Sequence, residues 1–242
     1  MKKGILVCCH GTRNPDGVND TKKLLRFFKK KKDYTVKIGY LEITKPSIKD
    51  QLSFFFRKKY DFLLLIPAMI FSGNHVTQDI PKILNNLKKK YTTSPTLFIN
   101  PPLLKSKKFL KIAQNSLIKK IRMIDNKKDG LIVVASNTVN SKARNEVNYL
   151  TKKIAKKNKI NFYKRIFITL NKAKLRKDLE KISLKHSKFL ILPLFLFRGN
   201  LLKNLILTIQ ETNEKGNKRF FLCSHLNNYK EIYNVINSSI KS

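Results

Sequence analysis

Short apolar runs alternate with longer amphipathic segments along the whole chain. The runs are rich in Ile, Leu, Val and Phe and are bounded by turn residues, so they predict β-strands. We place strands at residues 4–9, 35–41, 62–67, 96–99, 131–135, 161–170, 189–193 and 219–223. Between them, apolar residues recur with helical spacing at 18–31, 46–57, 80–90, 106–124, 141–157, 174–186 and 201–211.

The order of these elements predicts the fold class. A strand followed by a helix, repeated along the chain, is typical of α/β proteins with parallel strands. The predicted strands are almost uniformly apolar, which indicates that helices cover both faces of each sheet. We therefore expect an α/β fold built on parallel sheets.

The two halves of the chain resemble each other at one constant offset. The stretch from Leu63 reads LLLIPAMIFSGNHV, and the stretch 126 residues later, from Phe189, reads FLILPLFLFRGNLL. The same offset aligns ILVCCHGTRN, which begins at Ile5, with LIVVASNTVN, which begins at Leu131. Two matches at one offset indicate that an α/β unit with four strands has been duplicated.

The duplication sets the expected domain organisation. We predict an N-terminal unit at residues 1–125 and a C-terminal repeat at 126–242, joined near 125–130. A chain of 242 residues, 42% of them hydrophobic, is long enough for one large core or two small ones. No apolar run approaches the roughly 20 residues of a membrane span. The first apolar run is also too short for a signal peptide, so we expect a cytoplasmic protein.

The net charge of +37 raises the question of a nucleic-acid partner. The excess is mostly lysine and is spread over nearly every predicted helix. Lysine runs at 29–32 and 88–90 fall at helix C-terminal ends, where they interact favourably with the helix dipole. We therefore expect no nucleic-acid partner, although the charge would attract a small polyanion. Because no apolar run is long enough to span a membrane, we expect no membrane partner either.

Three polar side chains follow the first three predicted strands. His10 comes directly after the first strand, Glu42 after the second, and His75 lies in the expected loop after the third. Ligands bind at the carboxyl ends of the strands in open parallel sheets, so these residues belong on one edge. Imidazole binds divalent first-row metals and also accepts protons, which indicates a metal-handling or proton-transfer site.

The second copy serves as an internal comparison for the two histidines. At the offset of 126, His10 aligns with Ser136 and His75 with Leu201, while the surrounding apolar and turn residues persist. Packing alone would favour similar residues in both copies, so the comparison favours chemistry. The alternative is a pair of loop histidines without a role, and Glu42 could instead cap the next helix or pair with a lysine.

The motifs around these residues resemble those of the class II tetrapyrrole chelatases. They read ILVCCHGTR at the first strand, YLEITKPSIKDQL after the second and IPAMIFSGNHVTQDIP after the third. Their order and spacing are most similar to the sirohydrochlorin cobaltochelatase and ferrochelatase group. The second half resembles the divergent C-terminal repeat of the long form of that family.

The resemblance implies two tandem flavodoxin-like units, each a four-stranded parallel sheet flanked by helices, that face each other across a cleft. It implies insertion of a divalent metal, with Co²⁺ ahead of Fe²⁺ and Ni²⁺, into sirohydrochlorin on the way to cobalamin or siroheme. The metal is then a substrate, and no tightly bound cofactor is expected. The second copy supplies the wall that a shorter family member would borrow from a partner, so we expect a monomer that forms a pseudo-dimer.

The resemblance also assigns roles to individual residues. His10 and His75 would bind the metal and accept the pyrrole protons. His186 and His225 lie outside these motifs, and from their sequence context alone we expect them to be helix-end and loop residues. The residues expected to contact the tetrapyrrole or its incoming metal are Gly11, Thr12, Arg13, Glu42, Ser72, Gly73 and Asn74.

The sequence is also compatible with other functions. The same macrocycle could receive iron or nickel, since the two histidines suit all three metals. A metal- or tetrapyrrole-binding carrier would bind stoichiometrically without metalation. A basic RNA-binding α/β protein would show salt-sensitive affinity for nucleic acid.

Overall fold

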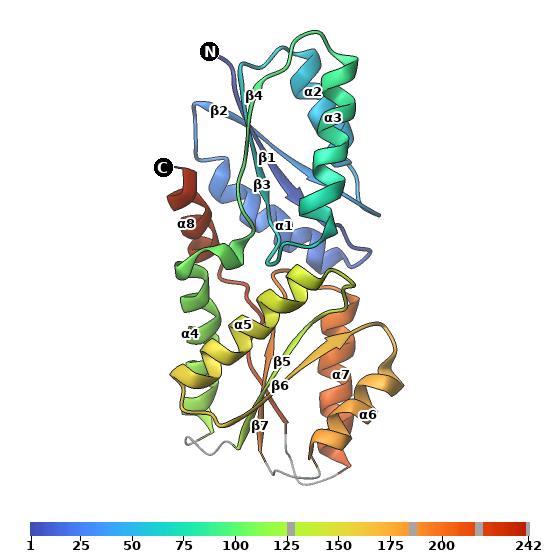
Figure 1. The fold of residues 1–242 in the computed structure, drawn as a ribbon, viewed down its shortest axis with the longest axis vertical. Coiled ribbons are helices and arrows are strands. Elements are labelled where there is room, and N and C mark those ends of the chain that lie inside the picture. Colours follow the sequence, from blue (N-terminus) through green and yellow to red (C-terminus); the bar gives the residue numbers. More distant parts are fainter. Residues whose placement is uncertain (125–128, 184–187, 216–219, 241–242) are drawn as a thin grey trace. The chain divides into compact units, whose positions relative to one another are not determined.

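A computed structural model describes residues 1–124, 129–183, 188–215 and 220–240. The chain divides into two compact units, which we call unit 1, residues 1–109 and 228–242, and unit 2, residues 110–227. Figure 1 shows the ribbon of both. None of the helices in the described part of the chain combines the length and the apolar character that a bilayer span requires.

Unit 1 is built on a four-stranded parallel sheet in the order β2-β1-β3-β4. Its strands and helices are β1 (Lys3–Cys9), α1 (Pro15–Phe28), β2 (Tyr34–Tyr40), α2 (Ile48–Arg57), β3 (Phe62–Pro67), α3 (Ile80–Lys90), β4 (Thr96–Ile99) and α8 (Tyr229–Ile240). A π-helical turn, His75–Asp79, precedes α3, and a 3₁₀ turn, Leu103–Lys105, follows β4.

Helices cover both faces of the unit 1 sheet, as its apolar strands predicted. Helices α2 and α3 lie side by side over one face (Figure 1), where Leu6 and Leu65 of the strands pack against Phe55 of α2 and Leu84 of α3. Helices α1 and α8 pack against each other, and the ring of Phe28 meets the ring of Tyr233 edge-on at 5.0 Å between centroids.

Unit 2 repeats this sheet in the order β6-β5-β7-β8, again all parallel. Its elements are α4 (Lys107–Met123), β5 (Gly130–Ser136), α5 (Ser141–Lys157), β6 (Phe162–Ile168), α6 (Lys172–Ser183), β7 (Phe189–Pro193), α7 (Asn200–Glu214) and β8 (Phe220–Leu222). The core on one face joins these strands to α6 and α7, with Phe189 of β7 fully buried.

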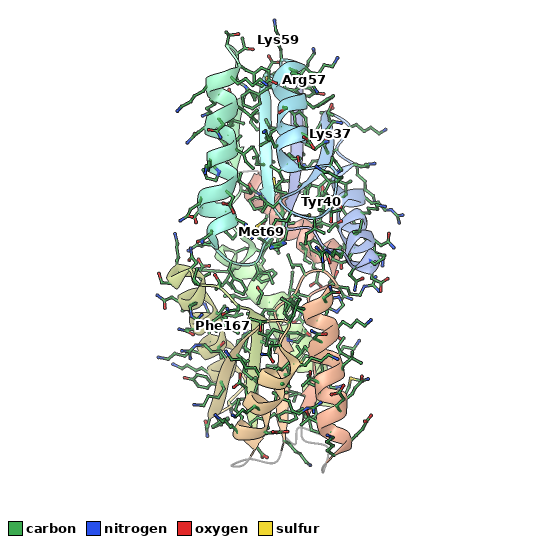
Figure 2. All side chains as sticks on the ribbon, turned by 90° about the vertical axis from the view of Figure 1, so that its right-hand side faces the viewer. Lys37, Tyr40, Arg57, Lys59, Met69 and Phe167 are labelled. Atoms are coloured by element: carbon green, nitrogen blue, oxygen red, sulfur yellow. The ribbon has the colours of Figure 1, made fainter. Side chains whose placement is uncertain are left out.

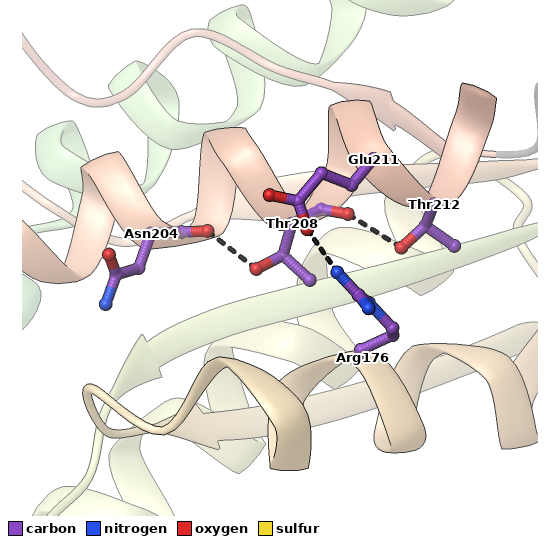
Figure 3. A network of polar contacts seen from close by, with 5 residues as sticks. All are labelled: Arg176, Asn204, Thr208, Glu211 and Thr212. Atoms are coloured by element: carbon purple, nitrogen blue, oxygen red, sulfur yellow. Dashed lines mark hydrogen bonds and ion pairs between the residues drawn. The ribbon is translucent and has the colours of Figure 1, made fainter. Parts of the chain in front are cut away.

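Polar contacts tie α6 to α7 at the edge of that core (Figure 3). The Arg176 guanidinium of α6 pairs with the Glu211 carboxylate of α7. On α7 the Thr208 hydroxyl donates to the Asn204 carbonyl at 2.8 Å, and the Thr212 hydroxyl donates to the Thr208 carbonyl at 2.6 Å. These contacts stabilise the packing of α6 and α7. The described residues of the two helices include no histidine.

The duplication is visible in the backbone. The Ala68 amide donates to the Cys8 carbonyl at 2.8 Å, and 126 residues later the Leu194 amide donates to the Val134 carbonyl at the same distance. The helix that follows the first strand also starts alike in both copies. Asn14 and Asn140 are the N-caps of α1 and α5, and each accepts a backbone hydrogen bond through its side chain.

Each compact unit holds one of the two sheets, as expected. The last helix of each sequence repeat, however, belongs to the unit built on the other repeat's sheet. Most of α4, which ends the first sequence repeat, belongs to unit 2, whereas α8, which ends the second repeat, belongs to unit 1. The division at 125/126 was inferred from the repeats alone and stays a prediction of where the two copies join.

Several elements differ from expectation. The helix predicted at 18–31 is α1, which spans Pro15–Phe28, and the strand predicted at 161–170 is β6, which spans Phe162–Ile168. No helix was expected after residue 223, but α8 follows β8, with Ile232, Val235 and Ile236 buried. The helix predicted at 174–186 is α6, which begins two residues earlier. Its predicted end at 184–186, His186 included, lies outside the described residues.

Candidate metal centre

The first three strands of unit 1 end at the same edge of its sheet. In the register of the sheet, Cys9 of β1 lies beside Tyr40 of β2, and Cys8 lies beside Pro67 of β3. Figure 2 shows Tyr40 and Met69, which follows β3 closely, toward one end of the unit, away from Lys59, which precedes β3. The segments that follow the three strands therefore emerge together, as expected for parallel strands.

The segments after β1 and β2 are in direct backbone contact. The ladder between the strands continues past them, because the Leu41 amide donates to the Cys9 carbonyl and the Glu42 amide donates to the His10 carbonyl, both at 3.0 Å. Gly11 has a φ of +100°, and a Cβ atom built there would lie 1.9 Å from the Glu42 carbonyl oxygen. Only glycine allows the two backbone segments to come this close. The close contact keeps Glu42 beside His10.

A pair of threonines fixes the same two segments further along. The Thr44 hydroxyl accepts from the Thr12 amide at 2.9 Å and donates to the Thr12 carbonyl at 2.9 Å. Between Glu42 and Thr44 the chain makes a tight turn, in which Ile43 has a φ of 64°. The position of Glu42 is therefore set by hydrogen bonds on both sides of it.

His75 was expected in a loop. It is instead the first residue of the π-helical turn that leads into α3. The Gly73 carbonyl accepts from the amides of Val76 at 3.0 Å and Thr77 at 3.1 Å, which anchors the turn. One side of the imidazole is engaged, since His75 Nδ1 lies 2.6 Å from Asp79 Oδ2. Pro81 lies in the first turn of α3, where proline is tolerated.

The three predicted residues come together in unit 1. His10, Glu42 and His75 each offer one ligand atom, and these atoms all lie within 4.8 Å of one another. The two imidazole rings meet edge-on, 4.7 Å apart at an interplanar angle of 84°. Ligand atoms about 2.0–2.2 Å from one ion are separated by up to about 4.4 Å, so a small adjustment would let all three reach a single cation.

The exposure of these side chains suits an exchangeable ion. His10 and Glu42 are exposed, and His75 is about one-third exposed at 32%. The neighbouring thiols are different. Cys8 and Cys9 are fully buried in β1, and burial raises the pKa of both thiols, so they stay protonated. The donor set is therefore two imidazoles and one carboxylate, open to solvent.

The remaining predicted residues line the same segments. Arg13 is exposed, and Gly73 and Asn74 are half-buried, whereas Ser72 is only 3% exposed. The Thr12 amide is already bonded to Thr44. Their contacts with a substrate stay a prediction, as do the roles of Gly11 and Glu42.

Asp79 was missed as a site residue, although a histidine and an aspartate four residues apart can meet on a helical turn. The other described histidine, His225, is half-buried in unit 2, between β8 and α8, and takes no part in the cluster.

Known proteins resemble this chain in sequence and in fold. The sirohydrochlorin cobaltochelatase of Methanococcoides burtonii is 34% identical over 84 residues, which make up 34% of this chain and 64% of that protein. The match thus spans just under two thirds of the relative.

Two solved structures share the fold. SirB, the sirohydrochlorin chelatase of Bacillus subtilis subspecies spizizenii in complex with cobalt, has a TM-score of 0.78 at 15% identity over 100% of this chain and 94% of its own. CbiX, the terminal enzyme for biosynthesis of siroheme in denitrifying bacteria, has a TM-score of 0.69 at 14% identity over 99% of this chain and 98% of its own. At these identities the likeness is one of fold.

The family model of CbiX matches residues 4–120 and 130–242, which include both copies of the repeat. Together with the three motifs and the paired four-stranded sheets, this match shows that the chain belongs to the CbiX family of class II tetrapyrrole chelatases.

Proposed function

We propose that the protein inserts a divalent metal ion, Co²⁺ before Fe²⁺ or Ni²⁺, into sirohydrochlorin. The observation that carries the proposal is the cluster of His10, Glu42 and His75, whose ligand atoms lie within 4.8 Å of one another. Membership of the CbiX family and the relatives named sirohydrochlorin cobaltochelatase support the substrate and the choice of cobalt.

The cluster suits the chemistry of metal insertion. The incoming ion must lose water, and the macrocycle must lose two N–H protons as the metal enters. Two neutral imidazoles and a carboxylate can hold the ion and leave coordination positions open. As the metal passes to the macrocycle, each imidazole regains a lone pair and can take up one of the two protons. Glu42 contributes a negative charge that attracts the cation.

The carboxylates of the macrocycle would meet a cationic protein. Sirohydrochlorin carries acetate and propionate groups on its rim, and the chain has a net charge of +37. We assign the rim contacts to exposed Arg13 and to the segments around Gly11 and Asn74, where guanidinium and amide groups can bind carboxylates. We further propose that a single chain suffices for activity, since it carries both copies of the repeat.

The test is metalation itself. Purified protein is mixed with sirohydrochlorin and Co²⁺, Fe²⁺ or Ni²⁺ under anaerobic conditions, and initial rates are followed in the visible spectrum against reactions without protein. We expect catalytic turnover, fastest with Co²⁺. Binding of one equivalent of metal or tetrapyrrole without acceleration of metalation would contradict the proposal and indicate a carrier.

A further inference from the structure

Asp79 makes the shortest polar contact of the His75 side chain that the structure describes. Its Oδ2 lies 2.6 Å from His75 Nδ1, within the hydrogen-bond range, and both residues belong to the turn His75–Asp79. The aspartate is 46% exposed and the histidine 32%, so the contact lies at the surface of the site. Asp79 is outside the cluster of three ligand candidates.

The chemistry of this contact decides which ring nitrogen is available. An ionised carboxylate can only accept hydrogen bonds, so the neutral imidazole must donate through Nδ1–H. The lone pair is then on Nε2, the nitrogen left for a metal ion or a proton. Histidines that bind metals generally donate their other ring N–H to a carboxylate or a backbone carbonyl, which fixes the tautomer and orients the ring.

The first histidine shows the same arrangement with a weaker acceptor. His10 Nδ1 lies 3.3 Å from the carbonyl oxygen of Gly11. Both imidazoles therefore have an oxygen acceptor at Nδ1, which leaves Nε2 of both rings for the site. The carboxylate on His75 is the stronger acceptor of the two, since charge-assisted hydrogen bonds are shorter and stronger than neutral ones.

The second copy of the repeat has lost both members of the pair together. At the offset of 126 residues, His75 aligns with Leu201 and Asp79 aligns with Leu205. Leu205 is fully buried in the core of unit 2, and α7 begins at Asn200 without a π-helical turn. The π-helical turn thus occurs in the copy that has the pair, and such turns are frequent at functional sites.

We propose that Asp79 is the positioning residue of His75: its carboxylate holds the imidazole as the Nδ1–H tautomer and presents Nε2 to the incoming metal. The role of His75 toward the metal rests on the function proposed above, whereas the tautomer is a property of the free protein. Asp79 itself touches neither metal nor macrocycle.

The test uses Asp79→Asn and Asp79→Ala, with Gln78→Ala as the control on the same turn, because Gln78 is exposed. Three quantities are measured on the full chain: the His75 tautomer from imidazole ¹⁵N shifts, assigned with His75→Ala; the Kd for Co²⁺ alone; and the metalation rate. Asparagine is isosteric with aspartate, so a purely structural role would leave all three unchanged in Asp79→Asn.

We expect wild type and Gln78→Ala to show the Nδ1–H tautomer. In Asp79→Asn the amide can donate to Nδ1 and favour the Nε2–H form, as isosteric amides do at histidines in other sites. Both Asp79 variants should lose the Nδ1–H signature and weaken Co²⁺ binding by about 10- to 100-fold. Retention of the Nδ1–H form and of wild-type Co²⁺ affinity in Asp79→Asn would overturn the proposal. Absence of metalation by wild type would instead refute the proposed function, while the tautomer would still decide the role of Asp79.

Discussion

Replacement of Gly11 by alanine is a direct test of how the site is held together. The residue has a φ of +100°, and an added Cβ would lie 1.9 Å from the Glu42 carbonyl oxygen, whereas real Cβ atoms do not come within 3.0 Å of such an atom. The Glu42 carbonyl must therefore retreat by about 1 Å, or the segment after β1 must change its path. Either response separates Glu42 from His10.

The magnitude follows from two terms. A non-glycine residue in a sparsely populated backbone region costs about 1–3 kcal/mol, and relief of the clash costs about 1–3 kcal/mol more. Together they predict that the free energy of unfolding falls by roughly 2–6 kcal/mol, which corresponds to a fall in Tm of roughly 4–24 °C for a chain of this size. For protein that remains folded, a displacement of about 1 Å predicts metalation about 10²-fold slower.

The matched control is Gly4→Ala, at the other end of β1. A Cβ there would lie 2.5 Å from Cε1 of Phe55, so this variant should also unfold at a lower temperature. It leaves the segments that carry His10 and Glu42 in place, and its folded fraction should metalate at the wild-type rate. Thermal unfolding by circular dichroism and initial metalation rates separate the two variants. A Gly11→Ala protein with wild-type Tm and wild-type rate would refute the reasoning.

Three further predictions follow from the structure. Glu42→Gln removes the only carboxylate of the three-residue cluster and should raise the Kd for Co²⁺ at least about tenfold, as measured by titration of the protein with Co²⁺; an unchanged Kd would exclude Glu42 from the metal centre. Burial raises the pKa of Cys8, and that of Cys223 to about 12, so both thiols should resist iodoacetamide at pH 8 until the protein is unfolded; rapid labelling of native protein would contradict this. Hydrogen bonds from Ser47 lower the pKa of Asp50, so the capping box stabilises the fold at neutral pH and this contribution is lost as the pH falls through the lowered pKa. Asp50→Asn should therefore lower the free energy of unfolding by about 0.5 kcal/mol at pH 7, a small value because the pair is exposed, and should leave it unchanged in acid, where Asp50 is protonated. Urea unfolding measures both values, and an equal loss at the two pH values would contradict a role for the Asp50 charge.

The strands and the edge on which the site lies could be predicted from sequence because burial on both faces leaves a uniform apolar run. Strands such as Phe62–Pro67 and Phe189–Pro193 were placed with the bounds that the structure shows. Since parallel strands end at a common edge, the meeting of His10, Glu42 and His75 followed from their positions alone.

The features that were missed depend on interactions that periodicity does not encode. Helix α8 carries apolar residues at helical spacing, but its Asn and Ser residues favour turns and caps and weaken the signal. Periodicity shows which face of a helix is apolar and not which sheet it covers, so the exchange of α4 and α8 between the units was not predictable. The π-helical turn that joins His75 to Asp79 has no sequence pattern of its own.

The central claim is that His10 and His75 jointly hold the metal and take up the protons, and the most direct measurement is the metalation rate of their alanine variants. His10→Ala and His75→Ala should each be slower by about 10²–10⁴-fold with the fold intact, and the double variant should be little worse than the worse single one. Ser136→Ala, at the exposed position that matches His10 in the second copy, should react like wild type. A wild-type rate of sirohydrochlorin metalation in either histidine variant would contradict the account.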